Sequence, residues 1–162
     1  MRKIQDEYLR SSLFGFEDAL VSTTGMVVGI SIGTSNLKFI LLAAFVTIAV
    51  EAVSMGAGEF LSDEAVHELD RKLGKDNTLI SATVMFTSYI LGGLIPVLPI
   101  ILLPALQGII GSITAAFIGL FVLGFIKGKI VNVNRIRSAV EMLTIGGIAT
   151  VIGIVVGFIL KI

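Results

Sequence analysis

The stretch LISATVMFTSYILGGLIPVLPIILLPALQGIIGSITAAFIGLFVLGFI, residues 79–126, contains no Asp, Glu, Lys or Arg. A helix needs about 20 apolar residues to cross the hydrocarbon core of a bilayer, so this stretch is long enough for two crossings. Its three prolines, Pro96, Pro99 and Pro104, crowd the middle of the run. Two spans fit this length better than one strongly tilted helix. The stretch therefore predicts two membrane-spanning helices, over residues 78–103 and 106–126.

Three further apolar segments flank this pair. Together the five predicted spans cover residues 12–35, 37–61, 78–103, 106–126 and 139–160. Hydrophobic residues make up 55% of the chain and charged residues 15%, and the mean hydropathy is +1.00. A water-soluble domain carries more charge than this. We therefore expect an all-α, polytopic membrane protein with a single transmembrane domain over residues 1–162.

Charge and cysteine content exclude several classes of site and partner. The formal net charge is zero, which argues against nucleic acid as a partner. The absence of cysteine excludes disulfides and thiolate metal sites.

The basic residues are distributed unevenly between the two sides of a five-span topology. Those on the side of the N-terminus are Arg2, Lys3, Arg10, Arg71, Lys72, Lys75, Lys127, Lys129, Arg135 and Arg137. Only Lys38 and Lys161 fall on the other side. Because cytoplasmic loops of membrane proteins are enriched in Lys and Arg, this asymmetry predicts a cytoplasmic N-terminus and an outside C-terminus.

Five carboxylates lie within the predicted spans: Asp18, Glu51, Glu59 and Glu141, with Glu17 beside Asp18 and one residue nearer the interface. A charge near the bilayer centre costs at least about 2.5 kcal/mol, and such residues usually face a bundle interior or an aqueous cavity. Glu51, Met55 and Glu59 follow one another at intervals of four residues, which places them on one side of a helix. They could line one passage.

The residue types indicate a transition metal as the transported ion. Carboxylates bind divalent cations and release protons as the metal arrives. A thioether is soft and neutral, so mixed carboxylate and Met ligation favours Fe²⁺ or Mn²⁺ over harder ions. Taken alone, Met55 is more often a core filler than a ligand. The one basic residue within the predicted spans, Lys38, stands at the start of the second span, 13 residues before Glu51. Metal or protons are therefore the expected counter-charges of the acids.

Two other acidic features are weaker candidates. Glu141 stands near the start of the fifth span, where a helix cap or a surface ion pair explains it at least as well as transport. The connection SDEAVHELDRKLGKDN, residues 62–77, carries Glu64, His67 and Glu68. It could extend the second helix and collect cations, although a solvated helix in the loop is the simpler explanation. The glycines of the first and fifth spans are spaced for close helix packing.

Three segments resemble the vacuolar iron transporter family. They are GFEDALVSTTGMVVGIS at residues 15–31, SMGAGEFLS at residues 54–62 and LGGLIPVLPIILL at residues 91–103. The resemblance implies a five-span protein, not an enzyme, that exports Fe²⁺, and often Mn²⁺, from the cytosol in exchange for protons. It implies no cofactor, since the metal is the substrate, and a homodimer whose pathway is formed by the first and second helices.

Residue by residue, the resemblance assigns metal contacts to Asp18, Met55 and Glu59, and Glu51 matches a polar position of the second helix. One departure concerns the connection between the second and third spans. Members of the family from eukaryotes carry a long, Glu-rich cytoplasmic metal-binding domain there. Here only the short acidic stretch with Asp63, Glu64, Glu68 and Asp70 remains. The short form suggests a prokaryotic source and a plasma-membrane location.

Two alternatives stand beside a transporter. In the first, the protein is a non-transporting membrane subunit whose buried acids serve assembly with a partner. This hypothesis gains if Glu51 and Glu59 face different sides of the bundle, which they do not on a helical wheel. In the second, it is an intramembrane enzyme. The second is disfavoured because the predicted spans contain no nucleophile–base pair and no His cluster.

Overall fold

The computed structural model describes residues 2–69 and 78–160, with side chains described from residue 7 onward. Within these ranges the chain forms five helices and no strand. The helices are α1 (Arg2–Gly33), α2 (Leu37–Leu69), α3 (Thr78–Leu102), α4 (Ala105–Ile130) and α5 (Arg135–Ile159). All five are long and apolar enough to cross a membrane. The protein is therefore an integral, multi-pass, all-α membrane protein, which confirms the predicted fold class.

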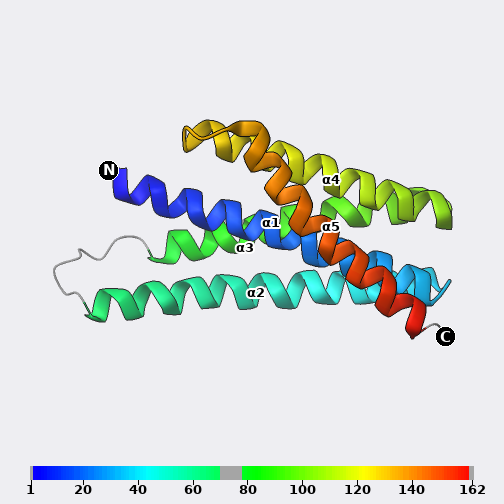
Figure 1. Cartoon of the computed structure of the whole chain (residues 1–162). Helices are drawn as coiled ribbons and strands as arrows, with labels where there is room; N and C mark the ends of the chain where they lie inside the picture. The colour runs from blue at the N-terminus through cyan, green and yellow to red at the C-terminus, as the bar shows by residue number, and fades with distance from the viewer. Residues whose placement is uncertain (1, 70–77, 161–162) are drawn as a thin grey trace.

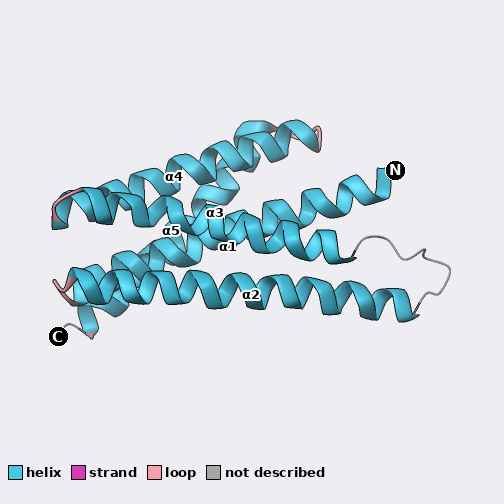
Figure 2. Ribbon diagram, turned by 180° about the vertical axis from the view of Figure 1, so that it is seen from behind, coloured by secondary structure: helices cyan, strands magenta, loops and turns pink. Residues whose placement is uncertain are grey.

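The helices run up and down, so their connections alternate between two ends of the bundle (Figures 1 and 2). The start of α1, the end of α2 and the α4–α5 turn lie at one end, here called the N-terminal end. The α1–α2 and α3–α4 turns and the end of α5 lie at the opposite end. Helix α1 is the central element, because half of its most apolar window is buried, compared with 22% in α4 and in α5.

The charge-free stretch divides where the sequence predicts. Helix α3 ends at Leu102, and α4 begins after Pro104, whose backbone is extended (φ −60°, ψ 152°). Pro96 and Pro99 remain inside α3. Prolines are tolerated in membrane helices because neighbouring helices satisfy the freed backbone groups. Here Pro104 accounts for the break, since a proline disfavours the helical conformation of the residue before it.

Two helices are longer than the hydropathy of their residues indicates. Helix α1 begins ahead of residue 12, and α2 continues through the charged connection to Leu69 instead of ending at residue 61. Hydropathy locates the apolar slab that fits the bilayer and does not mark where a helix stops. The polar turns of both helices therefore continue beyond the apolar segment at the N-terminal end.

Helices α1 and α5 cross with their backbones in close contact, along a surface that we call the glycine seam. It consists of Gly25, Gly29 and Gly33 of α1 and Ala149, Gly153 and Gly157 of α5. A Cβ added at Gly29 would stand 2.6 Å from the carbonyl oxygen of Gly153, which is too close for any side chain. Small residues are what permit such contacts between membrane helices, so the packing role expected for these glycines is confirmed.

A second contact holds α1, α2 and α3 at one level. Ala19 of α1, Ala52 of α2 and Tyr89 of α3 form a cluster in which all three residues are fully buried. The two alanines stand beside two of the predicted site residues, Asp18 and Glu51. This contact therefore sets the position of those acids within the bundle.

Candidate functional site

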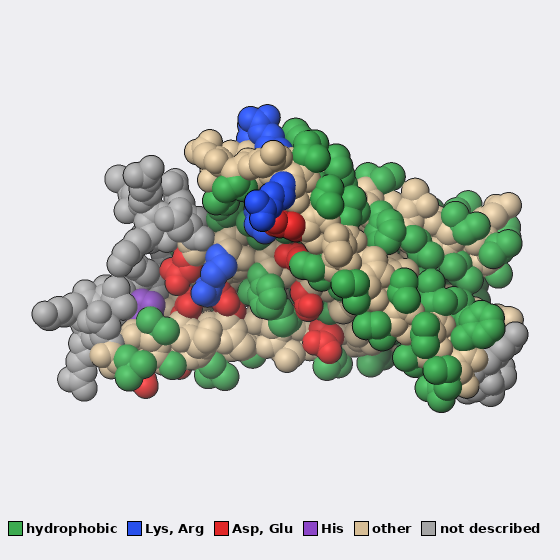
Figure 3. Space-filling model, in the orientation of Figure 1, with side chains coloured by type: hydrophobic (Ala, Val, Ile, Leu, Met, Phe, Trp, Pro, Cys, Tyr) green, Lys and Arg blue, Asp and Glu red, His purple; other side chains and the backbone are tan. Residues whose placement is uncertain are grey.

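Asp18 and Glu51 form an acidic pair on the side of the molecule where α1 and α2 meet. The contact of their neighbours Ala19 and Ala52 brings them to one level, and Asp18 lies within the electrostatic field of Glu51. Asp18 is half-buried and Glu51 is exposed. Figure 3 shows acidic side chains in a file across the middle of this face of the molecule. The structure thus brings together two of the four predicted site residues as a pair, hereafter the Asp18–Glu51 pair.

The acid beside this pair is influenced by a basic residue, whereas the pair itself has no basic partner. Glu17 lies in the fields of Asp18 and of Lys127 on α4. Among the described residues, no Lys or Arg forms an ion pair with Asp18 or Glu51. The pair is therefore a place where a cation or a proton would lower the electrostatic cost.

A hydroxyl pair adjoins these acids. Tyr89 of α3 is fully buried, and its Oη lies 2.9 Å from Ser22 Oγ of α1 in a hydrogen bond that either group can donate. The Tyr89 hydroxyl is also within the field of both Asp18 and Glu51. Sequence analysis missed these two polar groups. The available signals were the position of Ser22 one turn after Asp18 and the presence of a tyrosine in a charge-free span.

Met55 is partly buried and packs against the cluster of Ala19, Ala52 and Tyr89. This is the environment of an ordinary core methionine, which fills irregular gaps between helices. The same packing keeps the thioether on the side of α2 that meets α1 and α3, one helical turn after Glu51. The geometry is compatible with either role of Met55.

Glu59 has surroundings unlike those of Glu51. It is only 8% exposed, and its Oε1 accepts hydrogen bonds from Ser11 Oγ at 2.5 Å and from Arg10 Nη2 at 3.1 Å. Arg10 therefore neutralises an acid for which the sequence indicated no basic partner. Arg10 precedes the predicted first span. Because α1 begins before that span, Arg10 is part of α1 and faces Glu59 of α2.

Asp63, one turn after Glu59, joins the same group. Asp63 Oδ1 lies 3.9 Å from Arg10 Nη2, while the buried Oδ2 has no hydrogen-bond partner. His67 Nδ1 lies 2.7 Å from the backbone oxygen of Asp63, and Glu7 of α1 lies in the field of Asp63 and Arg10. We call this group the N-terminal-end cluster; it consists of Glu7, Arg10, Ser11, Glu59, Asp63 and His67. Sequence analysis did not include Glu7, Arg10 or Ser11 among the candidates, because they precede the apolar segment.

The weaker candidates fall in different places. Glu64 and Glu68 are exposed, whereas His67 is partly buried. Glu141 is exposed and its Oε1 lies 3.0 Å from Arg137 Nε, so the surface ion pair is the one observed among the explanations left open for this residue. Asp70 lies outside the described residues. Within the described ranges, no three His, Asp or Glu side chains are already placed to hold one metal ion together.

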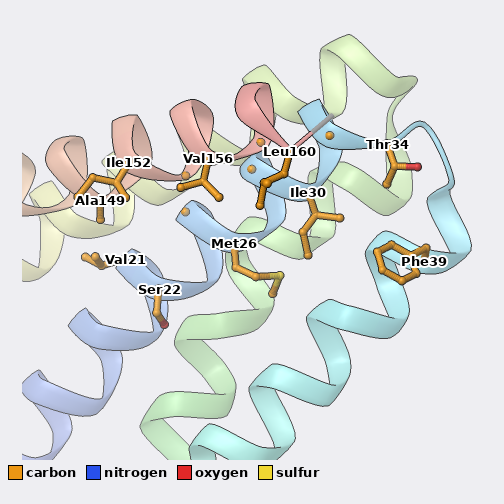
Figure 4. A pocket seen from close by; sticks show the side chains of 15 residues that line it. Val21, Ser22, Met26, Ile30, Thr34, Phe39, Ala149, Ile152, Val156 and Leu160 are labelled. Carbon is orange, nitrogen blue, oxygen red and sulfur yellow. The ribbon is translucent and has the colours of Figure 1, made fainter. Parts of the chain in front are cut away.

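The opposite end of the bundle carries an apolar groove instead of acids (Figure 4). Its volume is about 550 Å³, and it is lined by α1, α5 and the start of α2, including Met26, Ile30 and Val156. The glycines of the glycine seam contribute to its wall. Its lining contains no charged residue, so it offers no carboxylate to a metal ion.

Comparison with known proteins gives a consistent result. The VIT family model matches residues 9–76 and 63–158. Vacuolar iron transporter homolog 3 of Arabidopsis thaliana is 26% identical, over 90% of this chain and 80% of that protein. Vacuolar iron transporter 1 of the same plant is 24% identical, over 89% of this chain and 82% of its own length. The vacuolar iron transporter of Centaurea cyanus is 25% identical, over 89% and 84%.

The alignments also differ in length. The alignment with homolog 3 extends over 159 residues, and the alignment with vacuolar iron transporter 1 over 206 residues, more than the 162 of this chain. The second relative therefore contains residues that have no counterpart here.

Proposed function

Since the chain belongs to the VIT family, we propose that it is a divalent metal transporter that exports Fe²⁺, and also Mn²⁺, from the cytosol in exchange for protons. Its relatives are named vacuolar iron transporters, which supports transport of metal as the function in place of catalysis. The observation that carries the proposal is the Asp18–Glu51 pair, two acids in membrane-spanning helices without a basic partner among the described residues. Metal and protons are the two cations that would compete for it.

The antiport follows from charge balance at this pair. Two neighbouring carboxylates repel each other when both are charged, so in the antiport that we propose the pair takes up a proton when metal leaves it. A divalent ion that binds both oxygens must displace that proton. The neighbouring thioether of Met55 would favour Fe²⁺ over harder ions, and the Tyr89 hydroxyl would hold the carboxylates or water in place.

A second copy of the chain is part of the proposal. Glu51 is exposed in a membrane-spanning helix, and an ionisable residue facing lipid is costly. Only 28% of the most apolar window of α2 is buried, and a Cβ at Gly58 would meet nothing within 4 Å. A symmetric dimer through α1 and α2 would cover this face and bring two Asp18–Glu51 pairs to one axis.

We propose that the N-terminal end of the bundle is cytoplasmic and the opposite end outside. The described basic residues Arg10, Lys127, Lys129, Arg135 and Arg137 all belong to helix segments at the N-terminal end. Single cysteines at Lys38 and Val133, at opposite ends, should react with an impermeant thiol reagent from opposite sides of sealed membranes. Labelling of both from one side would contradict the orientation.

One observation favours the alternative of a non-transporting assembly subunit. Glu59 is buried and hydrogen-bonded within the chain, whereas Glu51 is exposed, so the two acids lie in different environments. In that case Glu51 would bind a polar group of a different membrane protein. The transport assay distinguishes the two functions.

The assay uses purified protein in sealed vesicles, loaded in turn with a dye that reports Fe²⁺ or Mn²⁺. We expect metal uptake that rises when the vesicle interior is made acidic relative to the outside, since outward proton flow would then drive inward metal flow for chains inserted in that direction. Vesicles without protein are the blank, and Glu141→Gln, which removes only a surface ion pair, is the matched control. Uptake equal to the blank under both conditions would reject transport, and uptake indifferent to the pH gradient would reject the antiport.

A further inference from the structure

The N-terminal-end cluster contains a buried acid whose bonding is incomplete. Asp63 is 6% exposed, and its Oδ2 is buried without a hydrogen-bond partner. Its Oδ1 is 3.9 Å from the Arg10 guanidinium, which is beyond hydrogen-bond distance. The carboxyl group of Glu7 shares a side-chain hydrogen bond with Asp63, which still leaves Oδ2 without a partner. A buried carboxylate oxygen without a partner is costly, so the site is one donor or one cation short of satisfaction.

The residue that neutralises the cluster is itself loosely held. The Arg10 side chain is 64% exposed, and its Nη2 contacts Glu59 at 3.1 Å as a single-atom contact. Only the Arg10 side of this ion pair is exposed, since Glu59 is buried. Solvent screens the guanidinium and the long side chain loses freedom in forming the contact, so the attraction that holds Arg10 in place is reduced. The carboxylates are fixed and buried, whereas the cation that faces them can swing out to water.

We propose that Arg10 is a displaceable counter-ion, and that a divalent cation entering from the N-terminal end replaces its guanidinium and binds Glu59 and Asp63, with Glu7 and His67 within reach. Carboxylate oxygens and an imidazole nitrogen are donors that suit Fe²⁺ and Mn²⁺. The described side chains do not yet converge on one point, so the donors close around the ion after Arg10 leaves. The inference rests on the proposed function, because it makes this cluster the point where the transported metal is first bound.

The displacement would also explain why the acids of this cluster do not hold the metal permanently. Once the ion moves toward the Asp18–Glu51 pair, the guanidinium returns to Glu59 and restores the charge balance of the cluster. The arginine thus sets how tightly the entry site holds metal, since every binding event must overcome the Arg10–Glu59 contact.

Equilibrium binding of Mn²⁺ to the purified chain, measured by calorimetry, tests the proposal without requiring transport. Arg10→Gln should tighten Mn²⁺ binding by about tenfold, the scale of one lost competing ion pair. Mn²⁺ should also raise the melting temperature of this variant by more than it raises that of the wild type. Arg10→Lys keeps the charge and should stay within about twofold of the wild type.

Two further variants separate the proposal from a general effect of charge. Arg137→Gln removes an arginine that is also paired with a glutamate, at 3.0 Å, but on the surface of α5, and it should leave Mn²⁺ binding unchanged. Asp63→Asn alone should bind Mn²⁺ more weakly than the wild type. Combined with Arg10→Gln, it should cancel the increase in Mn²⁺ affinity that Arg10→Gln causes. Should Arg10→Gln fail to fold, Asp63→Asn alone decides, since unchanged Mn²⁺ affinity in that variant overturns the proposal.

The outcomes distinguish this inference from the function on which it rests. Tighter binding in Arg10→Gln, lost again with Asp63→Asn, supports the displaceable counter-ion even if no variant moves metal across a membrane. Transport by the wild type together with unchanged binding in Arg10→Gln keeps the proposed function and overturns the inference. A gain that Arg137→Gln reproduces would also overturn it, because the effect would then come from net charge alone.

Discussion

Glu51 and Glu59 lie two turns apart on α2, about 12 Å along the helix axis, and their carboxylates have different surroundings. Glu59 is buried against α1 and receives hydrogen bonds from Ser11 and Arg10. Glu51 is exposed and acts electrostatically on Asp18, and neither acid forms an ion pair with a described Lys or Arg. One acid is satisfied by neighbours in its own chain, and the other has no ion-pair partner among the described residues.

The difference indicates that the two acids of α2 have different roles. A carboxylate that residues of a neighbouring helix neutralise is stable without a bound cation. A carboxylate that is unpaired in an apolar span must be protonated, metal-bound or covered by another molecule. The first belongs to the polar end of the bundle and the second to its middle. The following predictions test or sharpen this contrast.

The largest effect is expected for the unpaired acids. Asp18→Asn and Glu51→Gln each keep the shape of the side chain and remove its charge. Metal uptake into vesicles should fall to the level of protein-free vesicles, because neither metal nor proton would then be held at this level of the pathway. The melting temperature should stay the same or rise, since a desolvated charge has been removed. Retained uptake in both variants would show that the pair is not on the pathway.

A large effect on stability is expected away from the acids, at the glycine seam. Gly29→Val places a side chain where a Cβ would stand 2.6 Å from the Gly153 carbonyl oxygen. We expect a loss of about 3 kcal/mol in unfolding free energy, because α1 and α5 must separate. Gly58→Ala is the matched control, since nothing lies within 4 Å of its added carbon. Equal stability of the two variants would contradict the tight crossing.

A smaller, selective effect is expected at Met55. Met55→Leu preserves volume and should change stability by less than about 1.5 kcal/mol. If the sulfur contacts the metal, Fe²⁺ uptake should fall several-fold and discrimination against harder ions should relax. Met26→Leu, a change of the same kind on the apolar groove, provides the comparison. Equal Fe²⁺ uptake by the two variants would assign Met55 to packing alone.

The smallest effect is expected at the hydroxyl pair. Tyr89→Phe removes the hydrogen bond to Ser22 and should cost about 1 kcal/mol of unfolding free energy. Ser22→Ala should cost a similar amount, and the double variant should cost less than the sum of the two. Additive losses would mean that the two hydroxyls do not stabilise the bundle through their mutual contact.

Much of the architecture could be predicted from the sequence, because lipid imposes a simple rule on length and hydropathy. The five spans, the break beside Pro104 and the packing of the glycines at 25 and 29 follow from that rule. The Glu141 surface pair followed from its helix position and neighbouring charges. These features depend on one helix or on the contact between two.

The partners of the acids were harder to predict. The pairing of Arg10 with Glu59 depends on α1 continuing well before its apolar segment, and hydropathy carries no information on that extension. The different surroundings of Glu51 and Glu59 arise because eight residues turn a helix by about 80° beyond two full turns. That drift is small on a helical wheel, yet it is enough to move a side chain from the α1 contact to the exposed face.

The central claim is that the exposed face of α2, which carries Glu51, meets a second copy of the chain to enclose the pathway. The chain contains no cysteine, so single cysteines can be placed along α2 and crosslinked in membranes. Cysteines at Ser54 and Gly58, which are exposed, should form crosslinked dimers, while a cysteine at the fully buried Ala52 should not. Crosslinking at Ser54 and Gly58 that traps a dimer and changes metal uptake would agree with the account. Absence of any dimer at both exposed positions, with normal uptake, would contradict it.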